Sequence, residues 1–137
     1  AVIQTYNPEN ETIICAANQD YDSFYNDEIE LRKLLIYPPF CEFINFVFSS
    51  EKKDEARKLG EKFRNELIKT VSSAEAIIYQ LTEAPIFRIN GKYRYRILIK
   101  TRYSKDLYDK IAFLNKKISS SRLDAQISID VNPSNMY

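Results

Sequence analysis

The sequence predicts an α+β domain with a ferredoxin-like βαββαβ sandwich, in which two helices cover one face of a four-stranded antiparallel sheet. Three observations lead to this fold class. From residue 41 onward, segments with strand and helix patterns follow one another in the order β-α-β-β-α-β. The dipeptide Asn90-Gly91, a strong signal for a two-residue hairpin turn, joins the two middle strands. Both βαβ crossovers are expected to be right-handed, which places the two helices on the same face.

Ahead of this domain we expect a short strand and an acidic linker helix. Residues 2–6 (VIQTY) have the composition of a strand. From Asp20 to Leu35, apolar and aromatic residues recur at steps of three and four, which is typical of a helix. The Pro38-Pro39 pair ends that helix, because proline disfavours helical geometry at the residue before it. The chain therefore divides into segments 1–19, 20–40 and 41–137.

The first half of the domain contains two expected strands and one helix. Residues 41–50 (CEFINFVFSS) are rich in β-forming residues on both faces, which predicts a central strand. Residues 52–71 carry apolar side chains at helical spacing, and Ser50 is placed to cap this helix. Residues 75–82 (EAIIYQLT) predict the second strand.

The second half repeats the pattern. Residues 92–102 (KYRYRILIKTR) predict the third strand, which the hairpin turn connects to the segment IFRI. Ser104 is placed to cap a second helix. Residues 125–131 (AQISIDV) alternate strictly between apolar and polar side chains, which predicts the last strand.

The composition excludes several classes of chemistry. The chain has 137 residues, 45% of them hydrophobic, which suffices for the core of one domain or of a small domain with part of a neighbour. It has no His and only two Gly, so His-based triads and glycine-rich phosphate loops are ruled out, and we expect no catalysis in this segment. Cys15 and Cys41 are expected to be reduced thiols rather than zinc ligands. No apolar run is long enough to span a membrane and no secretory signal is evident, so we expect a cytoplasmic protein.

The net charge of +1 conceals a strong segregation of charge. Residues 1–31 hold seven acidic side chains and no basic one, whereas residues 84–105 hold seven basic side chains and no acidic one. The acidic segment is expected to be a solvated helix face, or else to repel DNA or dock on a basic neighbour. The basic segment favours a nucleic-acid contact, because a phosphate backbone responds to a local patch and not to the average charge.

The predicted strand 92–102 is the one pattern that indicates a binding chemistry. Its even positions are mostly basic and its odd positions are apolar or aromatic, so alternation places a cationic row on one face. Same-face residues lie roughly 6.5–7 Å apart, close to the spacing of phosphates along one strand. Tyr93 and Tyr95 share the parity of the apolar residues and are expected to face the helices rather than stack on bases. The candidate DNA-binding residues are Arg88, Lys92, Arg94, Arg96, Lys100 and Arg102. A plain solvated sheet face, with cations that protect an edge from aggregation, is the alternative.

Four stretches, in order along nearly the whole chain, resemble the carboxy-terminal part of the primosomal protein N′ family, the replication-restart DNA helicases of bacteria. They are VIQTYNPEN, DYDSFYNDEIELRKLLIYPPF, GKYRYRILIK and SIDVNP. The sequence departs from the family pattern at Tyr95, where tryptophan is common, and at Asn132, where aspartate is usual.

The resemblance implies a parent protein that is an ATP-dependent 3′–5′ DNA helicase with a zinc-binding insertion and that loads the replication machinery with other primosome proteins. Residues 1–19 would be the end of the second helicase lobe, residues 20–40 a linker, and residues 41–137 the carboxy-terminal DNA-binding domain. ATP, magnesium and zinc would belong to upstream domains, so no cofactor is expected in this chain.

The resemblance also implies a site for the acidic tail of single-strand-binding protein. By alignment its residues would fall near Ser104 or Lys105 and near Tyr108, with Lys105 as the candidate for a contact with a carboxylate. We therefore expect a non-sequence-specific module that contacts forked or single-stranded DNA, with docking of the acidic tail as the alternative function. An acylphosphatase-like enzyme on the same plan would need a glycine-rich anion loop after the first strand, and FSSEKKDE contains none.

Overall fold

Strand β1 (Glu42–Ser50) forms the centre of the sheet in the computed structural model, which describes residues 1–119 and 124–134. It pairs antiparallel with β4 (Lys92–Thr101) on one side and with β5 (Gln126–Val131) on the other. The side chains of Ile44, Phe46 and Phe48 have no exposed surface, because they alternate onto the face that the helices cover. The central strand that the sequence predicts is confirmed.

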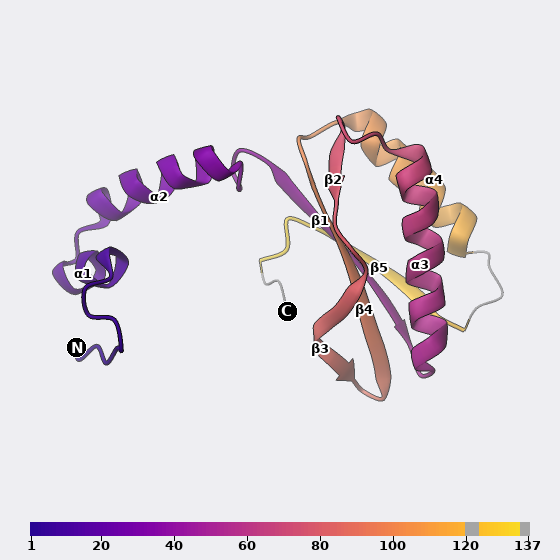
Figure 1. The fold of residues 1–137 in the computed structure, drawn as a ribbon, viewed down its shortest axis with the longest axis horizontal. Helices are drawn as coiled ribbons and strands as arrows, with labels where there is room; N and C mark the ends of the chain where they lie inside the picture. The colour runs from indigo at the N-terminus through magenta and orange to yellow at the C-terminus, as the bar shows by residue number, and fades with distance from the viewer. Residues whose placement is uncertain (120–123, 135–137) are drawn as a thin grey trace. The chain divides into compact units, whose positions relative to one another are not determined.

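The far edge of β4 is occupied by two strands in succession, so the sheet has five strands in the part of the chain that the structure describes. Strand β2 (Ala76–Ile78) pairs with the end of β4, and β3 (Thr82–Ile89) pairs with its beginning. Figure 1 shows them following one another along that edge. They take the place of a single second strand, so the ferredoxin-like order is retained with one edge strand in two pieces.

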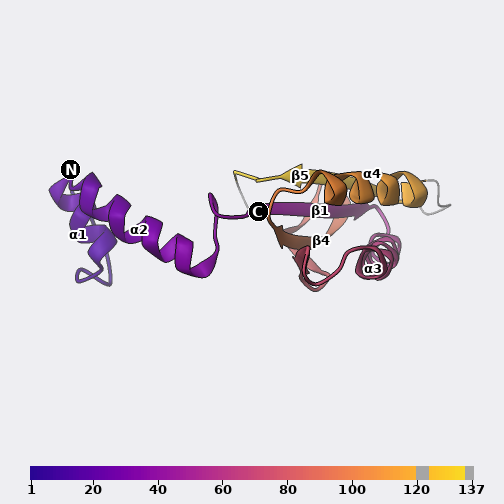
Figure 2. The same ribbon diagram turned by 90° about the horizontal axis from the view of Figure 1, so that it is seen from above.

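Helices α3 (Lys53–Thr70) and α4 (Lys105–Ser119) pack on the same face of the sheet, as the sequence predicts. Figure 2 gives the view in which α3 is seen nearly end-on beside the strands. Phe63 of α3 joins the two layers, since its ring centre lies 4.9 Å from that of Phe46 and 5.4 Å from that of Phe48. The side chains that α4 buries are Leu107, Ile111, Leu114 and Ile118.

The two expected helix caps have different outcomes. Ser104 accepts a long hydrogen bond, 3.5 Å, from the backbone N–H of Leu107, as expected for a cap of α4. Ser50 does not cap α3, whose N-cap is Lys52 without a side-chain hydrogen bond. The Ser50 hydroxyl instead donates to the backbone carbonyl of Asp124 at 2.6 Å, so it ties the end of β1 to the segment before β5.

Residues 1–40 and 41–137 are two compact units. The first contains helices α1 (Glu11–Asn18) and α2 (Tyr21–Leu35), and α2 is confirmed with Asp20 as its cap. The strand expected over 2–6 is wrong, because those residues are irregular and a lone strand without a pairing partner is unstable in water. Helix α1, capped by Asn10, was not expected. No side chain in this unit, all of which is described, is buried.

Candidate nucleic-acid interface

The basic residues of β4 lie on the sheet face opposite the helices. Tyr95, Ile97, Ile99 and Thr101 are buried toward the helices, and the even-numbered residues between them are half-buried on the other face. The open face therefore presents four cations along one strand. This basic row comprises Lys92, Arg94, Arg96 and Lys100.

The neighbouring strands supply uncharged and acidic side chains to the same open face. In the pairing of β1 with β4, Ser49 lies opposite Arg94 and Val47 lies opposite Arg96. In the pairing of β1 with β5, Asn45 lies opposite Asp130. Side chains of paired residues point to the same face of a sheet, so the carboxylate of Asp130 is also on the open face. It lies on β5, and β1 separates it from the basic row of β4.

The polar contacts of the hairpin cations go to uncharged groups. Lys92 Nζ donates to Gln126 Oε1 at 3.3 Å, and Arg94 donates to the backbone carbonyl of Ile86 at 3.3 Å. Arg88 donates to the backbone carbonyl of Gly91 at 3.4 Å, and its guanidinium lies 4.9 Å from the centre of the Tyr93 ring. Contacts of this kind orient a cation without neutralising it, so within the part of the chain that the structure describes these residues retain their attraction for anions.

A shallow depression of about 480 Å³ opens between the hairpin tip, β1 and β5. Lys92 and Arg94 line one side, and Ser128 and Asp130 line the other. Asn45 also lines it; this residue is 5% exposed, and its Oδ1 has no hydrogen-bond partner among the described residues. A buried amide oxygen is nearly always paired in a folded protein, so this one marks an unsatisfied site.

The two tyrosines of β4 lie on the helix side of the sheet, as the sequence favours. Tyr95 is buried and meets the Phe87 ring edge-on at 5.5 Å between ring centres. Tyr93 is half-buried, and its ring centre also lies 5.5 Å from that of Phe87. Neither ring is therefore available on the open face as a platform for stacking bases.

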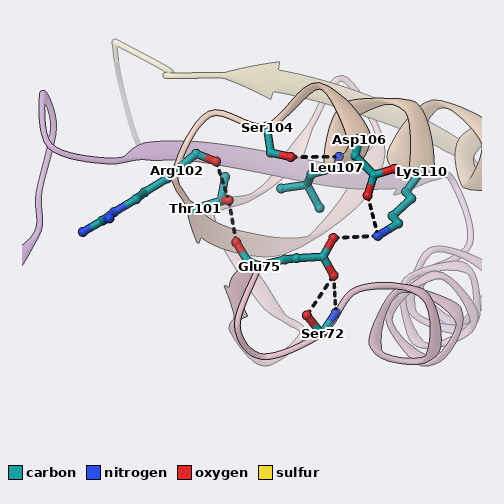
Figure 3. Close-up of polar contacts among 8 residues, drawn as sticks. All are labelled: Ser72, Glu75, Thr101, Arg102, Ser104, Asp106, Leu107 and Lys110. Carbon is teal, nitrogen blue, oxygen red and sulfur yellow. Dashed lines mark hydrogen bonds and ion pairs between the residues drawn. The ribbon is translucent and has the colours of Figure 1, made fainter.

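Arg102 follows the end of β4 and is not part of the basic row. Figure 3 shows its side chain pointing away from a cluster that joins the segment between α3 and β2 to β4 and α4. In this cluster the Glu75 carboxylate accepts hydrogen bonds from Lys110 Nζ at 2.6 Å and from the Ser72 hydroxyl at 2.8 Å. The Thr101 hydroxyl donates to the Glu75 backbone carbonyl at 2.7 Å. The hydrogen bonds that the carboxylate accepts from Lys110 and Ser72, led by that of Lys110, lower the pKa of Glu75 to about 2.

Lys105 and Tyr108, the expected contacts for an acidic tail, both lie near the start of α4. Lys105 is exposed in the first turn of α4. Tyr108 is half-buried, and its hydroxyl donates to Glu42 Oε2 at 2.8 Å. Burial, together with the Glu42 carboxylate, raises the pKa of Tyr108 to about 12. The Glu42 carboxylate already accepts the hydrogen bond of Tyr108. Its negative charge would repel a second carboxylate that approached the same hydroxyl.

The site residues that sequence reasoning missed come from β1 and β5. Asn45 and Asp130 reach the face only through strand pairing, which no local pattern reveals. The available signal was Asn45 itself, a polar residue in the middle of an otherwise apolar strand. Among residues 1–119 and 124–134, no group of three His, Cys, Asp or Glu could hold a metal ion. Nor does any helix in those ranges have the length and apolar character to cross a membrane.

These observations define a class: a ferredoxin-like α+β domain with a basic open sheet face. Residues 33–134 match the family described as the primosomal protein N C-terminal domain. The chain belongs to this family, as its four characteristic stretches indicate.

Curated relatives named replication restart protein PriA match nearly the whole chain. The protein from Chlamydia trachomatis is 32% identical over 96% of this chain, and that from Bacillus subtilis is 31% identical over 96%. The protein from Thermotoga maritima is 33% identical over 95%. The chain spans 17%, 16% and 16% of those proteins, respectively.

A solved structure of a de novo designed protein with a ferredoxin fold is 18% identical, with a TM-score of 0.47, covering 69% of this chain and 86% of that chain. The fold assignment made above rests on the strand order and the helix layer.

Proposed function

We propose that residues 41–137 are a DNA-binding domain that contacts the phosphates of forked or single-stranded DNA without reading sequence. The observation that carries this proposal is the basic row, which follows one strand on a face that the helices leave open. Its spacing of roughly 6.5–7 Å suits successive phosphates. Backbone contacts of this kind position a protein on DNA and do not specify a sequence.

We further propose that this domain acts in replication restart as part of a longer protein, in line with the names of its relatives. The parent would be an ATP-dependent 3′–5′ helicase whose ATP and zinc sites lie in other segments, and it would work with other primosome proteins in the cytoplasm. Residues 1–19 would complete its second helicase lobe and residues 20–40 would be the linker. The lack of buried side chains in residues 1–40, all of them described, supports a role that depends on packing against another part.

The DNA-binding proposal is tested by fluorescence anisotropy with forked and single-stranded oligonucleotides, using the full 137-residue chain. Replacing Arg94, Arg96 and Lys100 by Glu is expected to weaken binding at least tenfold, because each reversal replaces attraction for phosphate by repulsion. In the unaltered chain, the logarithm of the DNA-binding constant should fall linearly as the logarithm of the salt concentration rises, with a slope of about 2–3.5 in magnitude.

A matched control reverses three exposed lysines of the helical layer, Lys58, Lys62 and Lys116, so that the change in net charge is the same. This control should bind DNA far more tightly than the β4 variant, and thermal melts should show that both are folded. Equal binding by the two variants would contradict a role for the basic row.

Docking of the acidic tail of single-strand-binding protein is the second candidate function. The exposed position of Lys105 near the start of α4 favours it. In the same assay, a labelled acidic tail peptide replaces DNA and Lys105→Glu replaces the β4 variant. Loss of peptide binding with DNA binding retained would support docking at α4 as a separate activity.

A further inference from the structure

We propose that the depression around Asn45 is a pocket for one unpaired nucleobase that carries an exocyclic amino group. The proposal rests on the DNA-binding function proposed above and names what the open face would recognise besides phosphate.

Asn45 points to a ligand because its side-chain oxygen is buried without a partner. The residue lies in the middle of β1, where Leu98 of β4 and Asp130 of β5 are its paired neighbours. The residue is 95% buried, and Oδ1 has no hydrogen bond within the described residues. An apolar residue would avoid this cost, so we explain the oxygen by a donor from outside the chain, toward which the buried amide turns when the ligand binds.

The depression has the size and the walls of a small-molecule site. Its volume of about 480 Å³ lies within the usual range of about 300–1,000 Å³. Val47 and Ile89 supply apolar surface, and Ser49 and Ser128 supply hydroxyl groups. A planar ring with hydrogen-bonding groups on its edge fits this combination of walls and polar groups.

The acceptors in the pocket favour bases with an amino group. Asp130 lies opposite Asn45 across β1 and β5, and the Cβ atoms of such a pair are roughly 4.5–5.5 Å apart. A carboxylate and an unpartnered amide oxygen on neighbouring residues together call for hydrogen-bond donors. The amino groups of cytosine, adenine and guanine are such donors, whereas thymine has no amino group and offers only its ring N3–H.

The basic row lies beside the pocket, where it can bind the DNA backbone that carries the base. Lys92 and Arg94 line the same depression and are held by uncharged partners, so a phosphate attached to the bound nucleotide would meet their positive charge. A base in a duplex is stacked and has its hydrogen-bonding edge in use, so it cannot enter. The pocket therefore selects single-stranded DNA, including the unpaired strand of a fork.

The test compares the affinity of the full chain for labelled (dC)15 and (dT)15 by fluorescence anisotropy at one salt concentration. The unaltered chain should prefer (dC)15 by about fivefold or more. Asn45→Leu should abolish the preference while keeping the affinity for (dT)15, and it should raise the melting temperature because the unpaired oxygen is gone. Asn65→Leu, an exposed site on α3, should leave the preference unchanged.

A second variant and a second measurement cover the case in which Asn45→Leu does not fold. Asp130→Asn, at an exposed position, should also reduce the preference. In an NMR spectrum of the unaltered chain, adding (dC)15 should move the side-chain amide signal of Asn45 more than adding (dT)15. Equal affinity for the two oligonucleotides, with no shift of that signal, would overturn the base pocket and leave phosphate binding intact. Absence of salt-dependent binding to either one would overturn the DNA-binding proposal as well.

Discussion

Glu75 shows how a single carboxylate connects three elements of the domain. Its side chain accepts hydrogen bonds from Lys110 of α4 and from Ser72, which lies between α3 and β2. Its backbone carbonyl accepts one from Thr101 at the end of β4. All of these contacts to the side chain favour the ionised form, so they lower the pKa of Glu75 to about 2 from its usual 4.5.

The lowered pKa predicts an acid-dependent loss of stability. The ionised form is favoured in the folded state, so the stabilisation is complete above pH 4.5 and is lost as the pH falls from 4.5 toward 2. Glu75→Gln should lower the melting temperature at pH 7 and flatten its dependence on pH in this range. Melting curves followed by circular dichroism between pH 7 and 2.5 measure this effect. Glu51→Gln, at an exposed position before α3, is the control and should follow the unaltered chain.

The edge of the sheet shows what a local pattern leaves out. The sequence indicated one strand over 75–82, but β2 stops at Ile78 and β3 continues along the same edge. The register shifts between Glu83 and Arg88, a stretch that contains Pro85. Proline has no N–H to donate to a ladder, and this accounts for an irregular edge at that point. Pairing of β3 with β4 resumes beside the hairpin turn, and the uninterrupted pairing of β4 with β1 sets the register of the basic row.

The hairpin turn carries a prediction about stability. Asn90 and Gly91 both have positive φ, 49° and 83°, as a tight hairpin of this type requires. A Cβ at Gly91 would meet no atom within 4 Å, so Gly91→Ala introduces backbone strain and no clash. It should reduce the free energy of unfolding by about 1–2 kcal/mol. Asn90→Gly should change it by less than about 0.5 kcal/mol, since glycine accepts the same φ. Urea unfolding monitored by circular dichroism distinguishes these outcomes, and equal stability would mean that the turn relaxes.

For the whole molecule, the sequence predicted what repeats along the chain and missed what depends on contacts between distant segments. The periodicity of α2, α3 and α4 and the alternation of β4 are local, and the structure has them where expected. Helix α1 has only eight residues, too few for a clear period. Asn45 and Asp130 become neighbours only through the pairing of β1 with β5. The residue pattern within a single strand therefore does not predict the base pocket.

The division of the chain into two units predicts how it responds to truncation. Every buried side chain among the described residues belongs to residue 41 or a later one, so residues 41–137 contain the whole hydrophobic core. A chain that begins at Cys41 should therefore unfold cooperatively, with a melting temperature within a few degrees of that of the full chain.

Residues 1–40 hold seven acidic and two basic side chains, so removing them raises the formal net charge from +1 to +6. The truncated chain should bind single-stranded DNA more tightly at low salt, and the gain should shrink as salt screens the charges. Calorimetry and anisotropy titrations at two salt concentrations measure both effects. A fall of more than about 10 °C in melting temperature would show that residues 1–40 support the core, and an unchanged affinity would show that their charges act too far from the basic row to repel DNA.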